Sequence, residues 1–91
     1  MKTYTFELCA GRHTGYMDGI YPCRIDDFST RALERRADET IPQDCEKLEL
    51  YVTGFAMAIL AVVKICAKRG IRLDAYNYDP EYHMYIKQEV L

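Results

Sequence analysis

The chain has 91 residues, of which 49% are hydrophobic and 29% charged, and its net charge at pH 7 is −2. A chain of this size and composition forms one domain, residues 1–91, with a modest core, and small cores of this kind are often stabilised by pairing. The nearly neutral charge gives no field that would attract a polyanion over the whole surface, so nucleic acid is not an expected partner.

The apolar runs and the cysteines indicate a cytoplasmic protein. Residues 1–9 contain no unbroken apolar run of the signal-peptide type, and the apolar run Phe55–Val63 is too short to cross a membrane. The four cysteines form no C-x-x-C pair, which favours reduced structural thiols. We expect no membrane contact and no cofactor. We also expect no metal, because Cys9 and His13, taken with Cys23 or His83, lack the spacing of a structural zinc site.

The first half of the chain predicts a strand, a loop and a helix. Residues 2–9 alternate apolar and polar side chains, with Glu7 on the polar face, as in a half-buried strand. The glycine-containing loop "AGRHTGYMDG" follows, and "IYPCRI" indicates a short edge strand because Pro22 has no N–H for a central ladder. Capping residues at 26–30 precede an exposed helix at about 29–39, and Pro42 ends it.

The second half predicts a β-α-β crossover followed by a hairpin. A strand at 47–53, a helix at 55–69 and a strand at 71–78 are joined by so few residues that the two strands must be parallel. Lys68 and Arg69 suit the negative end of the helix dipole, and Gly70 suits its C-terminal cap. The turn Asp79-Pro80-Glu81 then leads into an antiparallel strand at 82–90. The predicted fold is α+β, a small α/β unit with a mixed sheet of about four strands.

The helix at 55–69 predicts a partner. Its first three turns have almost no polar side, and a helix that is apolar all round must be covered all round. The helix at 29–39 is mostly charged and covers little of it, so we expect the helix at 55–69, including Phe55 and Ile59, to meet a second copy in a two-fold dimer. The alternative is that its small alanines leave a harmless exposed stripe.

A ligand site is predicted where the parallel strands end. Ligands of open α/β sheets gather at the carboxyl ends of the strands, where a helix N-terminus favours an anion. If the first strand is parallel to the crossover strands, the side chains that meet there are Arg12, His13, Thr53, Gly54, Asn77 and Tyr78. Together they suit a nucleotide or a small anion. The alternative is that Thr53 caps the helix, Gly54 fits a tight turn, and the two basic residues are solvated.

Tyrosines are expected to cover the outer face of the hairpin. Tyr76, Tyr78 and Tyr85 fall on one face, and Met84, Ile86 and Val90 fall on the opposite face, which we expect to face the core. Tyrosine is enriched at protein interfaces, and the charge balance favours a protein partner over single-stranded nucleic acid. The alternative is an ordinary solvated sheet face with cross-strand aromatic pairs.

The strand–"VTG"–helix start resembles the ligand-sensing edge of Rossmann-like nucleotide-sensor domains, such as those of CRISPR ancillary proteins, over fewer than a third of the residues. In size, acidity and tyrosine content the chain also looks like phage-encoded antagonists of bacterial defence. No residues form a catalytic set, and a small hydrolase or nuclease using His13 has the least support. The sequence therefore favours a non-enzymatic, dimeric interaction protein, for instance a phage-type inhibitor of a host defence system. The alternative is a nucleotide or small-anion binding module.

Overall fold

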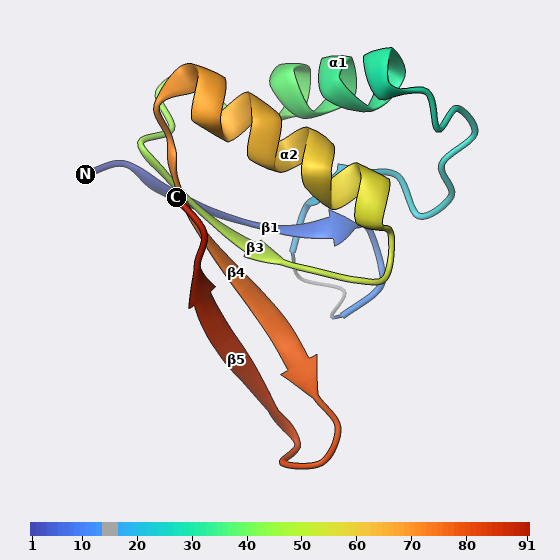
Figure 1. Ribbon diagram of the computed structural model, residues 1–91, viewed down its shortest axis with the longest axis vertical. Helices are drawn as coiled ribbons and strands as arrows, with labels where there is room; N and C mark the ends of the chain where they lie inside the picture. Colours follow the sequence, from blue (N-terminus) through green and yellow to red (C-terminus); the bar gives the residue numbers. More distant parts are fainter. Residues whose placement is uncertain (14–16) are drawn as a thin grey trace.

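The computed structural model describes residues 1–13 and 17–91 and contains two helices and one mixed sheet (Figure 1). In chain order the elements are β1 (Thr3–Cys9), β2 (Gly19–Tyr21), α1 (Thr30–Thr40), β3 (Lys47–Tyr51), α2 (Ala56–Arg69), β4 (Arg72–Asp79) and β5 (Met84–Glu89). The predicted α+β class is confirmed. Both predicted helices lie within one residue of their expected bounds.

The sheet has the strand order β2-β1-β3-β4-β5. Strands β1 to β4 are parallel, and only β5 runs antiparallel, to β4. The predicted crossover of β3, α2 and β4 is therefore confirmed. The sheet has five strands rather than about four, because Gly19–Tyr21 pairs with the end of β1, opposite Glu7 and Cys9.

Both helices cover the same face of the sheet, and neither of them lies over the other face (Figure 1). The core lies between these layers. It is built from Leu48 and Leu50 of β3, Phe6 and Leu8 of β1, and Leu73 of β4, all buried. Alternation places their neighbours Lys47, Glu49 and Tyr51 on the open face, which is the pattern expected of a strand covered on one side.

Helix α1 packs beside α2 and covers part of the apolar surface of α2. Leu33 and Ala37 of α1 are buried, and Lys64 Nζ of α2 lies 3.1 Å from Glu34 Oε2. The α2 helix ends where expected, at Gly70, whose φ of 68° is left-handed and therefore favours glycine. No helix among residues 1–13 and 17–91 is both long enough and apolar enough to cross a membrane.

The prediction that one face of β5 turns to the core is wrong. Met84, Ile86 and Val90 are 54%, 39% and 41% exposed. They lie on the helix side of the sheet, but the β4–β5 hairpin extends away from the helices, so nothing covers them (Figure 1). Alternation gave the correct face, but the end of the hairpin lies away from the two helices (Figure 1).

Candidate functional site

A broad, open cavity lies at the carboxyl edge of the parallel strands. It has a volume of about 490 Å³ and is lined by residues from the ends of β1, β3 and β4 and from β5: Arg12, His13, Val52, Thr53, Gly54, Asn77, Tyr78 and Tyr85. All six residues that the sequence assigns to a ligand site line this one cavity. They meet because β1, β3 and β4 run in the same direction and so deliver their following loops to one edge.

The loop after β1 is held over the open face by Glu7. This side chain is fully buried, and its carboxylate accepts hydrogen bonds from the backbone N–H groups of Gly11, Arg12 and His13 at 3.1, 2.9 and 3.0 Å. Its own N–H donates to the carbonyl of Asp18 at 2.9 Å. Glu7 thus fixes the backbone that carries two of the cavity's side chains, and sequence alternation alone gave no sign of this role.

Arg12 is positioned at one wall of the cavity. Its guanidinium donates to the Cys23 carbonyl at 3.4 Å and lies 5.5 Å from the centre of the Phe55 ring. The Phe55 ring is itself 6.0 Å from that of Phe28. A guanidinium has five N–H donors, and in the described part of the chain only this one hydrogen bond uses them, so the group suits a carboxylate or a phosphate.

Two buried polar atoms of the cavity-lining residues lack partners. His13 Nε2 has no hydrogen-bond partner among residues 1–13 and 17–91, and Thr53 Oγ1 makes no hydrogen bond of good geometry there, although it lies close enough to the Cys9 thiol to counter part of the rise in its pKa. The other ring nitrogen of His13, Nδ1, is 2.9 Å from the hydroxyl of Tyr85. Because buried polar atoms normally have a partner, the two orphaned atoms suit a bound group that hydrogen-bonds to both.

The N-terminus of α2 opens at the same edge. Its N-cap residue is Phe55, and Thr53 Oγ1 makes no capping hydrogen bond, so the alternative reading in which Thr53 caps this helix is wrong. Gly54 does not have a left-handed φ, and a Cβ added there would meet no atom within 4 Å. The fold therefore has no need of a glycine at 54, and the expected tight turn is not the reason for it. A bound anion that approaches the backbone would be a reason for glycine at this position.

An aromatic cluster forms the floor beside the cavity. The rings of Tyr51 and Tyr76 stack at 4.8 Å, and Tyr85 meets Tyr51 edge-on at 4.9 Å and Tyr78 at 5.3 Å. His13 completes the cluster, 5.6 Å from Tyr85. The predicted outer tyrosine face exists, but most of its rings pack on one another. Of the three tyrosines expected at a protein interface, only Tyr78 is more than a third exposed, at 43%.

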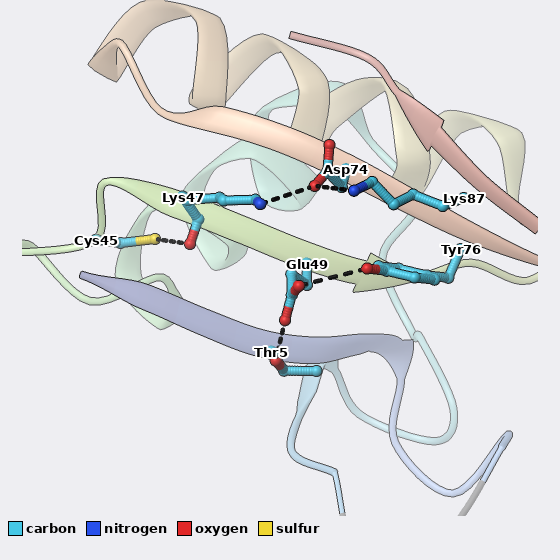
Figure 2. Close-up of polar contacts among 7 residues, drawn as sticks. All are labelled: Thr5, Cys45, Lys47, Glu49, Asp74, Tyr76 and Lys87. Atoms are coloured by element: carbon cyan, nitrogen blue, oxygen red, sulfur yellow. Dashed lines mark hydrogen bonds and ion pairs between the residues drawn. The ribbon is translucent and has the colours of Figure 1, made fainter. Parts of the chain in front are cut away.

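A polar network continues along the open face, away from the cavity. Figure 2 shows Glu49 between Thr5 and Tyr76, whose hydroxyl groups donate to its carboxylate at 2.9 and 3.3 Å. The largely buried Asp74 carboxylate lies 3.1 Å from Lys47 Nζ and 3.8 Å from Lys87 Nζ. Burial raises the pKa of Tyr76, and the negative charge of Glu49 raises it further. The phenol therefore stays protonated and can donate its hydrogen bond. These contacts link β1, β3, β4 and β5, the strands whose ends carry the side chains that line the cavity.

The environment of Cys9 argues against a reactive thiol. Cys9 is buried next to the cavity, and burial raises its pKa, although Arg12 and the Thr53 hydroxyl counter part of the effect. A protonated thiol is a poor nucleophile. No cluster of three or more His, Cys, Asp or Glu side chains suited to a metal occurs in the part of the chain that the structure describes.

The predicted interface residues of α2 lie further inward than expected. Phe55 and Ile59 are partly buried and pack against the core. The exposed apolar side chains of this helix are Met57 and Leu60, at 54% and 58%. The helix does present apolar surface to the outside, but on a different side from the residues that the sequence indicated.

Comparisons of the chain with protein-family models, with curated proteins and with solved structures give no match.

Proposed function

We propose that the protein binds a small anionic ligand with a flat aromatic group, a nucleotide being the best fit, in the cavity at the carboxyl edge of the sheet. The supporting observation is that one cavity of suitable size is lined by Arg12 and by two residues that each carry a buried polar atom without a described partner. Among the described residues the Arg12 guanidinium makes one hydrogen bond, to the Cys23 carbonyl, and His13 Nε2 and Thr53 Oγ1 are buried without described partners. A volume of about 490 Å³ falls in the range usual for small-molecule sites.

The chemistry of the lining assigns a place to each half of a nucleotide. A phosphate suits the wall of Arg12 and Gly54, where the first backbone N–H groups of α2 add partial positive charge. A base suits the opposite wall, because Tyr78 offers an exposed ring for stacking and Asn77 offers an amide for hydrogen bonds.

Thermal melting with a panel of nucleoside mono- and diphosphates, and with inorganic phosphate, tests the proposal. A nucleotide at about 100 times its Kd should stabilise the protein by about 2.7 kcal/mol. Arg12→Ala should abolish the shift, whereas Arg36→Ala, which removes an exposed arginine from α1, should leave it intact. If no nucleotide or phosphate at millimolar concentration changes the melting temperature, the cavity is not such a site.

The sequence-based hypothesis of a non-enzymatic interaction protein is the second candidate. It draws support from Met57 and Leu60, which stand exposed beside a small hollow of about 80 Å³ between α1 and α2. We infer that a protein partner would insert an apolar side chain there, because hollows of this kind anchor interface hot spots. Capture of one defined protein from lysate should be lost with Leu60→Glu and kept with Lys68→Glu on the same helix. Capture that is equal for both variants would contradict it.

A further inference from the structure

The outer edge of β5 is an open sheet edge, and Lys87 and Glu89 are the charged residues of this strand. Of the two edge strands, β2 has three residues and β5 has six. Every residue from 84 to 91 except Tyr85 is exposed, and the strand contains no proline. A long, open edge with apolar side chains is a template for pairing with another strand, and proteins usually blunt such edges.

The free hydrogen-bonding groups of this edge belong to alternate residues. The N–H of Val52 donates to the carbonyl of Tyr76 at 3.0 Å, so the peptide groups of Tyr76 point to β3, away from β5. Lys87 lies opposite Tyr76, and in an antiparallel pair such a residue points its own N–H and C=O outward. By alternation, Tyr85, Lys87 and Glu89 turn their backbone groups to the open edge, whereas Met84, Ile86 and Gln88 bond to β4.

We infer that this edge pairs with the β5 edge of a second copy, antiparallel and about a two-fold axis at Gln88. The sequence of the edge is self-complementary about that residue. Lys87 meets the partner's Glu89, and Ile86 meets the partner's Val90. Each of these pairs occurs twice, because a two-fold interface repeats every contact. Opposite charges and apolar side chains placed directly across an antiparallel pair are stabilising.

Other registers of the same pairing lack this complementarity. Moving the axis by one residue, to Lys87, places two lysines opposite each other, and like charges directly opposite are destabilising. Moving it to Ile86 leaves the Glu89 carboxylate opposite His83, which lies in the turn outside β5 and has a φ of 53°. The axis at Gln88 also covers Ile86 and Val90, two of the side chains that the helices leave exposed. The occupant that the charge pattern fits is therefore a second copy.

Sedimentation of the protein and its charge variants tests this interface. The chain of 10.6 kDa should sediment as a dimer at micromolar concentration. Glu89→Lys should weaken the dimer at least tenfold, because it places a lysine opposite the partner's Lys87, and combining it with Lys87→Glu should restore the dimer. A species of 10.6 kDa at all concentrations would overturn the inference, and so would a dimer whose dissociation constant is the same in the wild type and the charge variants.

Cross-linking tests the position of the axis independently of the charges. Residues facing each other in a non-hydrogen-bonded antiparallel pair have Cα atoms about 4.5 Å apart, which a disulfide can bridge. Gln88→Cys, made with Cys23→Ser to remove the exposed cysteine, should form an inter-chain disulfide under mild oxidation. Ile86→Cys in the same background should not form this disulfide, because residue 86 lies away from the axis and does not face residue 86 of the second copy. Equal or absent cross-linking of the two variants would place the interface elsewhere.

Discussion

Glu7 shows how one side chain can hold a functional loop. Its fully buried carboxylate accepts hydrogen bonds from three consecutive backbone N–H groups. Glu7→Gln replaces one carboxylate oxygen by an NH₂ group, which cannot accept a hydrogen bond from the Gly11 N–H. Hydrogen bonds to a charged group contribute about 1.5 to 3 kcal/mol, and a buried donor left unpaired costs a similar amount.

We therefore expect Glu7→Gln to lower the free energy of unfolding by about 2 to 3 kcal/mol in urea titrations. The matched control is Glu46→Gln, because Glu46 also accepts a backbone N–H, that of Lys2 at 2.7 Å, but at an exposed site. Its cost should be below about 1 kcal/mol. Equal losses for the two variants would show that the Glu7 carboxylate does not organise the loop.

Cys66 gives the stability of the protein a dependence on alkaline pH. Burial raises the pKa of its thiol from 9.0 to about 11. The unfolded chain releases this proton near pH 9 and the folded chain only near pH 11. The contribution of Cys66 to stability is therefore complete below pH 9 and falls as the pH rises toward 11, by about 2 to 3 kcal/mol in total.

Urea titrations at pH 8 and pH 10.5 measure this effect. Burial also raises the pKa values of Cys9, Cys45 and Tyr21, so the wild type should lose more stability than Cys66 alone explains. Cys66→Ala should lower stability at pH 8, because it leaves a cavity, but should lose less between the two pH values. An unchanged pH dependence in Cys66→Ala would contradict the assignment.

At the scale of the elements, the two ends of α2 differ in whether the fold needs their glycine. Gly70 has a left-handed φ, whereas Gly54 has neither a left-handed φ nor a close neighbour. Gly70→Ala should therefore cost about 1 kcal/mol or more of stability. Gly54→Ala should leave stability unchanged or raise it by up to about 1 kcal/mol, because it restricts the unfolded chain.

These substitutions separate folding from binding. Under the proposed function, Gly54→Ala should abolish the thermal shift with the nucleotide, because its methyl group lies where the phosphate meets the backbone. Gly70→Ala, at the other end of the helix, should keep the shift in full despite its lower melting temperature. A Gly54→Ala protein that still responds to the nucleotide would move the phosphate away from the start of α2.

Local patterns predict the elements well because each is set by neighbours in sequence. The alternation of Leu48 and Leu50 fixes β3, and the residues at 68–70 fix the end of α2 within one position. What depends on distant contacts was not predictable. Alternation places Glu7 on the polar face, but only the folded loop over it makes it buried, and Ile86 lies on the apolar face but beyond the reach of any helix.

At the scale of the whole molecule, the candidate site follows from strand direction. Once β1, β3 and β4 are parallel, the loops after them must meet at one edge, which is why Arg12, Thr53 and Asn77 line one cavity. Tyr85 and Val52 were missed as lining residues. Tyr85 comes from the antiparallel strand, and its place depends on the hairpin register, which pairs it with Tyr78. The sequence could have indicated Tyr85 as a lining residue, because the predicted hairpin places a tyrosine opposite Tyr78.

The arrangement of the sheet also predicts a pattern of amide hydrogen exchange along β5. In dilute solution the amides of Met84, Ile86 and Gln88 should exchange slowly, because they bond to β4, and those of Tyr85, Lys87 and Glu89 should exchange rapidly. At higher concentration, pairing of the edges should slow the exchange of the Lys87 and Glu89 amides. In the dimer the N–H of Lys87 donates to the carbonyl of the partner's Glu89, and the N–H of Glu89 donates to the carbonyl of the partner's Lys87. Tyr85 should remain rapid, because the residue across from it, the partner's Leu91, turns its N–H to its own Leu73. Exchange that slows equally at all three residues would require a different register, and exchange that is independent of concentration would mean that the edge stays open.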